Sequence, residues 1–174
     1  MITLVPIGEV KDAVLKSLAP PLAEIFAQET EVAGPLLLPQ GGWSRTRRQY
    51  LASALLALVP FPARGDRALG IADVDLYAPG LNFVFGIADT DGRRALISLA
   101  RLRPQFYGSP PDDALLLQRA VKEAVHELGH TYGLGHCRDP RCIMFFSNTL
   151  HDTDVKGPGF CAACNKKVDR GMRG

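Results

Sequence analysis

Every histidine and every cysteine of this chain lies between His126 and Cys164, in its last third. Three of the four histidines fall in the run HELGHTYGLGH, and the four cysteines follow as C-x4-C and C-x2-C. The first 125 residues contain no imidazole and no thiol, so the chemistry that needs these groups is expected within residues 126–164. Their spacing predicts two zinc sites in tandem.

Helical periodicity explains the histidine spacing. His126 and His130 are four residues apart, which places both imidazoles on one face of a helix. Glu127 is one step round that helix, where it can hold a water but cannot join the ligands. Gly133 is expected to end the helix, because glycine enters the left-handed conformation cheaply and lets His136 return to the same metal. Three neutral imidazoles leave one position open, as in catalytic zinc sites.

This ligand set predicts a zinc-dependent peptidase that acts on peptides or unfolded proteins. Zinc lowers the pKa of a bound water to about 7, so Glu127 can remove its proton near neutral pH. Glu127 then returns the proton to the leaving amine of the hydrolysed peptide bond. The alternative, a helix with buried structural histidines, is disfavoured because the glycine and the third histidine make a chance match rare.

The cysteines predict a second, closed zinc site. Cys137 directly follows His136, so the two side chains should point in different directions and serve different metals. Two close pairs are the usual layout of a four-thiolate structural site. Its ligands are Cys137, Cys142, Cys161 and Cys164. Two disulfides are the alternative, and a redox C-x-x-C pair is less favoured still.

The net charge and the N-terminal sequence indicate where the protein is expected to lie and which partners it is expected to lack. The formal net charge is +2, too small to imply a polyanion, and the run Arg45–Arg48 is interpreted as a solvated helix start rather than a phosphate site. Ile2–Gly8 lacks the features of a secretory leader, and no apolar run approaches the roughly 20 residues that span a bilayer. We therefore expect a cytoplasmic monomer without a nucleic-acid or membrane partner.

The apolar pattern predicts the order β-α-β-α-β-β-β-α. Helices are expected over Val10–Gln28, Trp43–Pro60 and Asp112–Gly133, with Asp112 and Asp113 as caps, and strands over Ile2–Gly8, Glu31–Leu38, Ala68–Leu76, Asn82–Ala88 and Arg94–Leu102. Pro20-Pro21 allows either one kinked helix or two helices. This order is typical of an α/β (α+β) protein, a mixed sheet with helices packed on it. We expect one domain over 1–174, with subdomains 1–133 and 134–174, the second held by metal in place of an apolar core.

Two groups of aspartates need an interpretation. Asp89–Gly92 predicts a hairpin turn; a calcium loop is excluded because Ala100 occupies the twelfth position, where glutamate is required. Asp73 and Asp75 are interpreted as hydrogen-bonded carboxylates at a strand end, with a functional role as the less favoured alternative.

The run HELGHTYGLGHCRDPRCIM, followed by CAAC, resembles the archaemetzincins of the metzincin clan of zinc peptidases. The resemblance implies a mixed sheet with an antiparallel edge strand, an active-site helix and a zinc-stapled C-terminal subdomain. It also implies that Met144 forms a structural base below the zinc, and that Arg94–Leu102 is the edge strand where substrate adds. Phe145 and Phe146 stand where some relatives place a tyrosine, and no pro-segment with an inhibitory cysteine is evident.

Other functions remain open from the residues alone. One alternative is a zinc-stapled binding protein for peptides or proteins with little or no turnover. Another is a nucleic-acid module built on the four cysteines and Arg45–Arg48, which the small net charge disfavours. His151 and Lys156 have no assigned role, and a surface position is the default for both.

Overall fold

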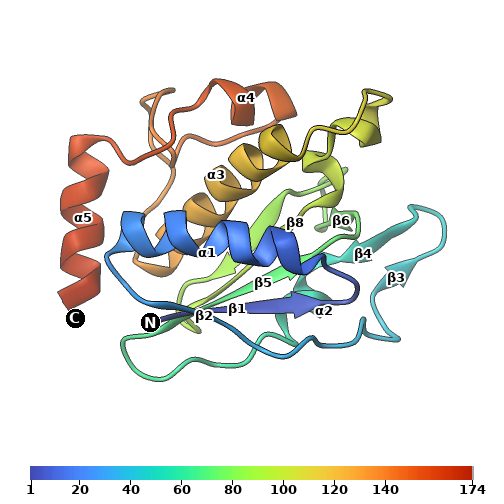
Figure 1. The fold of residues 1–174 in the computed structure, drawn as a ribbon, viewed down its shortest axis with the longest axis horizontal. Helices are drawn as coiled ribbons and strands as arrows, with labels where there is room; N and C mark the ends of the chain where they lie inside the picture. Colours follow the sequence, from blue (N-terminus) through green and yellow to red (C-terminus); the bar gives the residue numbers. More distant parts are fainter. Residues whose placement is uncertain (174) are drawn as a thin grey trace.

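A five-stranded mixed sheet forms the centre of the molecule, in a computed structural model that describes residues 1–173 (Figure 1). The strand order is β2-β1-β5-β8-β7; the first four strands run parallel and β7 is antiparallel to β8. The strands are β1 (Ile2–Ile7), β2 (Thr30–Val32), β5 (Arg67–Ala72), β7 (Gly86–Asp89) and β8 (Arg94–Ser98). The predicted mixed sheet with an antiparallel edge strand is confirmed.

The sheet is covered on both faces. Successive apolar side chains along its inner strands point to opposite faces, and each face has its own core. In β5, Leu69 and Ile71 face one core, while Ala68 and Ala72 face the other. The first core is covered by α1 (Asp12–Phe26) and α3 (Asp113–Thr131), and the second by the short helix α2 (Ala52–Leu56). Burial on both faces explains why β5 is apolar over most of its length.

The proline pair lies inside a single helix. Pro20 and Pro21 interrupt the backbone bonding of α1, yet the helix continues to Phe26. Leu18 and Leu22, which flank the prolines, are fully buried, so packing on the sheet compensates for the lost donors. Of the two predicted arrangements, one helix is therefore the observed one.

The prediction of a helix over Trp43–Pro60 is wrong for its first half. β3 (Trp43–Ser44) and β4 (Gln49–Leu51) form a hairpin, and β4 pairs with β6 (Leu76–Tyr77) in a second, three-stranded sheet. The rings of Trp43 and Tyr50 lie 4.9 Å apart across the hairpin, a cross-strand aromatic pair that favours the extended form. Arg45–Arg48 is consequently the exposed hairpin turn and not a helix start.

The edge strand also lies elsewhere than the resemblance implied. β8 is an inner strand between β5 and β7, and four of its five residues are buried, whereas all four residues of β7 are only half-buried. The antiparallel edge strand is therefore β7, and β2 lies at the other edge. After Ser98 the chain turns into two 3-10 helices, η1 (Ala100–Leu102) and η2 (Pro104–Tyr107). The predicted turn between β7 and β8 is confirmed, with the Gly92 N–H donating to Asp89 Oδ1 at 2.9 Å.

Three other predicted strands also differ in length from the expectation, and the one predicted over Asn82–Ala88 begins only at Gly86. The strand predicted over Glu31–Leu38 is limited to β2. The strand predicted over Ala68–Leu76 ends at Ala72, because Asp73 and Asp75 turn to form ion pairs with Arg103 and Arg101. The interpretation of these aspartates as hydrogen-bonded carboxylates at a strand end is confirmed.

The C-terminal part contains two helices that the sequence did not indicate. They are α4 (Leu150–Val155) and α5 (Ala162–Arg173), and α5 stands at one end of the molecule (Figure 1). Val168 of α5 is 1% exposed, and the Phe160 ring meets Phe26 of α1 at 5.9 Å. Apolar packing therefore contributes here, which corrects the expectation that metal alone replaces the core. Gly174 lies outside the described residues, and among the others no helix combines the length and apolarity that a bilayer crossing requires.

Candidate active site

Helix α3 carries three of the predicted site residues on its buried face. It begins after Asp112, whose Oδ1 accepts the Leu115 N–H at 2.8 Å, which confirms the predicted cap. From there the helix runs across the sheet, and His126, Glu127 and His130 lie in its last two turns. The cap and the apolar face fix the position of the helix, and through it the position of the two imidazoles.

A tight turn after α3 brings the third histidine back. Gly133 has a φ of 81°, and its N–H donates to the His130 carbonyl at 2.9 Å, as predicted for a glycine that ends the helix. The His136 ring then lies 5.0 Å from the His130 ring and 5.4 Å from the His126 ring. The three predicted histidines are therefore brought together from one helix and the loop that follows it.

The orientation of the imidazoles matches what a metal requires. His126 Nδ1 lies 2.9 Å from the Ile143 carbonyl oxygen, and His130 Nδ1 lies 2.7 Å from the Leu134 carbonyl oxygen. Because a carbonyl oxygen only accepts, each Nδ1 carries the proton and each Nε2 presents its lone pair. The two Nε2 atoms converge to 3.2 Å, close to the roughly 3.3 Å that separates two nitrogens on a tetrahedral zinc.

Burial keeps these histidines neutral. Loss of solvent is the main cause that lowers the pKa of His126 to about 3, and the Lys156 ammonium adds to the effect. Burial also lowers the pKa of His130 and of His136. At neutral pH all three rings are therefore in the uncharged form that binds a metal.

Glu127 lies beside the histidine cluster and is 7% exposed. Burial raises its pKa well above the ordinary value, the neighbouring Glu123 carboxylate raises it further, and Lys156 acts in the opposite direction. Its side chain packs against Gly86 at the start of the edge strand β7. A carboxyl with a high proton affinity, next to three convergent imidazoles, is suited to accept a proton during a reaction.

The four cysteines form a separate cluster of free thiols. Their sulfurs lie within 4.8 Å of one another, and Cys137 Sγ is 3.9 Å from Cys161 Sγ. Four thiolates on a tetrahedral zinc are spaced by about 3.8 Å. A backbone N–H of Cys164 is the main cause that lowers the pKa of Cys161 to about 7, whereas burial raises the pKa of Cys142 and of Cys164. As predicted, His136 and Cys137 belong to different clusters.

Met144 lies directly beneath α3. It is fully buried, and a methyl group added at Gly129 would stand only 2.5 Å from its sulfur. The Met144 carbonyl accepts the Cys137 N–H at 2.9 Å, so this turn contacts both clusters. The role that the resemblance implied for Met144, a structural base below the zinc, stays a prediction.

A cleft of about 230 Å³ opens beside the histidines. Three parts of the chain line it. We call the segment 81–86 and the residues 146–148 its two walls, and Glu123, His126 and Glu127 of α3 its floor. The Phe146 ring lies 4.7 Å from the His136 ring. Phe146 is one of the two phenylalanines at the place where some relatives are expected to carry a tyrosine. Sequence reasoning missed Gly86, Glu123 and both walls, which no local motif marks.

The two unassigned residues have different environments. His151 is exposed, as expected. Lys156 is 1% exposed, so the surface default is wrong for it. Its ammonium pairs with Glu123 at 2.9 Å in the interior, next to the cleft floor. No signal in the local sequence distinguishes this lysine from the other lysines in the chain.

Comparison with known proteins gives one consistent result. The model of peptidase family M54 matches residues 61–170. The archaemetzincin of Pyrococcus abyssi is 44% identical over 99% of this chain and 96% of its own length. The crystal structure of Methanopyrus kandleri archaemetzincin superposes with a TM-score of 0.85 at 40% identity, covering 100% of this chain and 96% of that chain. A zinc-dependent peptidase from Methanocorpusculum labreanum has a TM-score of 0.87 at 29% identity, covering 97% and 100%.

The fold, the histidine cluster and these relatives define a zinc metallopeptidase. More narrowly, the chain belongs to peptidase family M54, the archaemetzincins.

Proposed function

We propose that this peptidase uses Glu127 as its general base at a zinc held by His126, His130 and His136. The observation that carries the proposal is the convergence of three neutral imidazoles beside a buried carboxyl, at the floor of a cleft. Two rings are held by backbone carbonyls and the third packs on Phe146, so the ligands are oriented before any metal arrives.

Glu127 carries out both proton transfers of the proposed reaction. Zinc, when bound, polarises the substrate carbonyl and makes a water acidic enough to lose its proton near neutral pH. Glu127 accepts the water's proton and later gives it to the leaving amine. Burial supports both steps, because it raises the proton affinity of the carboxyl and keeps competing solvent away.

A second zinc is proposed at Cys137, Cys142, Cys161 and Cys164. Binding of structural zinc contributes about 10–16 kcal/mol in small peptides at neutral pH. Here it would tie the start of α5 to the loop that holds Cys137 and Cys142. Two zincs per chain follow from this assignment, with 1–133 and 134–174 as the two subdomains of one domain.

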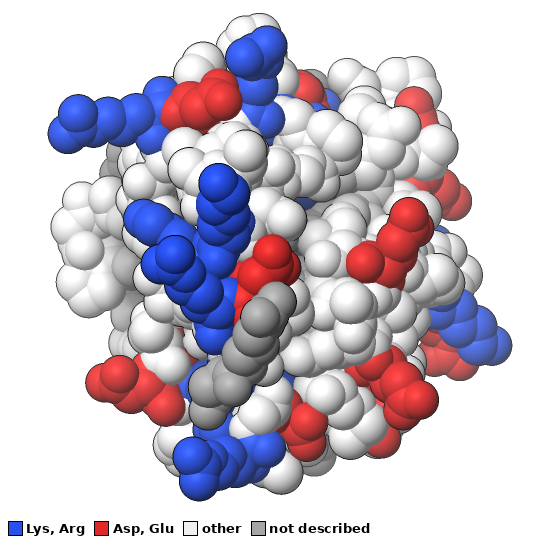
Figure 2. Space-filling view, turned by 90° about the vertical axis from the view of Figure 1, so that its left-hand side faces the viewer, with Lys and Arg blue, Asp and Glu red and all other residues white. Residues whose placement is uncertain are grey.

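Peptides or unfolded proteins are the proposed partners. An extended chain could lie between the segment 81–86 and residues 146–148, with its scissile bond above Glu127. Figure 2 shows the face that carries α5, where basic side chains gather but acidic side chains stand next to them. This mixed surface and the net charge of +2 favour a protein without a nucleic-acid partner. A cytoplasmic monomer remains our prediction.

Metal analysis combined with a peptide library tests the proposal. We expect two zincs in the wild type and in Glu127→Ala, with cleavage reduced by about 10²–10⁴-fold in the variant. Glu24→Ala, at an exposed glutamate of α1, is the control and should cleave as the wild type does. Undiminished cleavage by Glu127→Ala would contradict the mechanism. A zinc-loaded wild type that binds peptides without cleaving them would favour the alternative of a binding protein.

A further inference from the structure

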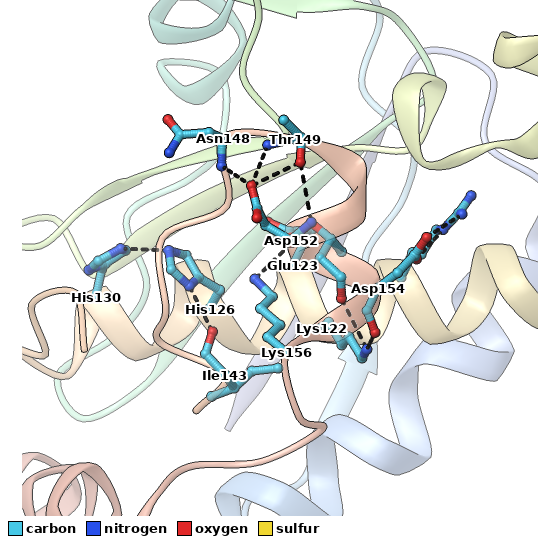
Figure 3. Close-up of polar contacts among 12 residues, drawn as sticks. Lys122, Glu123, His126, His130, Ile143, Asn148, Thr149, Asp152, Asp154 and Lys156 are labelled. Atoms are coloured by element: carbon cyan, nitrogen blue, oxygen red, sulfur yellow. Dashed lines mark hydrogen bonds and ion pairs between the residues drawn. The ribbon is translucent and has the colours of Figure 1, made fainter. Parts of the chain in front are cut away.

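Lys156 and Glu123 form an ion pair in the interior of the protein. Their side chains are 0% and 3% exposed, and Lys156 Nζ lies 2.9 Å from Glu123 Oε1 (Figure 3). Thr153 Oγ1 donates to the same carboxylate oxygen at 2.9 Å. A buried charge is expensive unless it is paired, so each of these two residues restricts where the other can lie.

The pair belongs to a series of contacts between α3 and α4. Arg119 donates to both oxygens of Asp154, each at 2.7 Å. Lys122 Nζ donates to the carbonyls of Thr153 and Asp154 at 3.0 and 2.8 Å. Arg119, Lys122 and Glu123 are spaced three and four residues apart, on one face of α3. This face fixes α4 in one register along the helix that carries Glu127.

The cleft wall is attached to α4 in turn. Asp152 Oδ2 accepts the backbone N–H groups of Asn148 and Thr149 at 3.0 and 2.9 Å, and Thr149 caps α4. Asn148 is part of the wall that Phe146 and Ser147 continue. The wall is therefore connected through Asp152 and α4 to the Lys156–Glu123 pair, which lies one helical turn before Glu127.

We propose that Lys156 is a positioning residue of the cleft, which through Glu123 holds the wall 146–148 at a fixed distance from Glu127. Of the two ion pairs that join α3 to α4 and its C-terminal end, this one is the more deeply buried and the nearer to the cleft, because Glu123 itself lines the floor. The consequence for substrates rests on the proposed function: the pair sets the space available to a substrate side chain next to the scissile bond.

Hydrogen exchange of the full-length, zinc-loaded protein tests the positioning itself. In Lys156→Met, amides of residues 146–155 should exchange at least about tenfold faster, because the wall loses its buried anchor. Amides of the sheet should keep their wild-type rates. Arg103→Met is the matched control, since it removes the Asp73 ion pair outside the cleft and should leave 146–155 unchanged.

A second variant covers the case in which Lys156→Met does not fold. Glu123→Gln with Lys156→Met leaves no unpaired charge in the interior, and such neutral replacements retain the fold in other proteins. It should show the same faster exchange at 146–155. Wild-type exchange of this segment in the double variant would overturn the inference.

Two hydroxamates separate the cleft wall from the zinc. Acetohydroxamate reaches only the metal, whereas a leucyl-peptide hydroxamate also places a side chain against the wall. The variants should bind the peptide hydroxamate at least about tenfold more weakly and acetohydroxamate within about threefold of the wild type. Equal losses for both ligands, or none, would overturn the inference. A wild type that binds neither would contradict the proposed zinc site, while hydrogen exchange would still decide the role of Lys156.

Discussion

Gly86 packs directly against Glu127, across the junction between the edge strand and α3. A methyl group at Gly86 would stand 2.6 Å from Glu127 Cγ and 2.6 Å from the Leu96 carbonyl oxygen, closer than atoms can approach. The absence of a side chain at position 86 therefore sets the place of the glutamate. The Leu96 backbone is part of the sheet and cannot withdraw, so an added methyl must shift the start of β7 and displace Glu127 as well.

Gly86→Ala should consequently lower peptide cleavage by about 10²-fold, because small displacements of a catalytic group have effects of that size. Zinc content should stay at the wild-type value, since the three atoms nearest to the added methyl belong to Glu127 and Leu96 and not to a proposed metal ligand. Gly34→Ala is the control, at a site where an added methyl meets nothing within 4 Å. Full activity of Gly86→Ala would contradict the proposed position of Glu127.

Gly129→Ala should destabilise the protein even though alanine is the better helix former. In an open helix this change gains about 1 kcal/mol. Here the new methyl would stand 2.5 Å from the Met144 sulfur, so we expect a net loss of about 1–3 kcal/mol in the free energy of unfolding. Urea unfolding of the zinc-loaded protein measures it. A stabilised variant would show that Met144 is free to move away.

Glu127→Gln should stabilise the metal-free protein, but only at pH values above the ordinary pKa of a glutamate. The folded state raises the pKa of Glu127, so it holds a proton that the unfolded chain loses, and stability falls as pH rises beyond about 4.3. The variant should therefore melt several degrees higher than the wild type at pH 7 and at the same temperature near pH 4. Each 1 kcal/mol corresponds to roughly 2–4 °C in a chain of this size. An equal difference at both pH values would exclude ionisation as the cause.

Cys164→Ser should remove one of the two proposed zincs. Cys164 is 7% exposed and packs within the main core cluster, so the loss should also loosen α5. We expect one zinc fewer per chain and faster proteolysis beyond Cys137, since binding at a structural site stabilises the fold directly. Asn165→Ser, at the exposed neighbouring position, is the control. Unchanged zinc content would contradict the four-cysteine assignment.

Local periodicity was sufficient for much of the site. Because four-residue spacing and a glycine turn are geometric properties of a short segment, the approach of His126, His130 and His136 could be predicted from the sequence. The grouping of the four cysteines followed in the same way. The mixed sheet and the hairpin at Asp89–Gly92 were equally accessible, since alternation and turn residues act over a few positions.

Tertiary packing decided the rest. Trp43–Leu51 has helix-compatible apolar spacing, yet the contact between Trp43 and Tyr50 makes it a hairpin. The inner position of β8, and with it the identity of the edge strand, depends on which strands bury both faces. From the sequence, Lys156 is expected at the surface. In the folded structure α4 packs on α3, and Lys156 is buried there beside Glu123. The sequence alone thus indicated the metal-binding chemistry, because the ligands stand in short motifs whose spacing is visible along the chain. Only the folded structure determined the cleft around it, because its two walls and its floor come from segments far apart in the sequence.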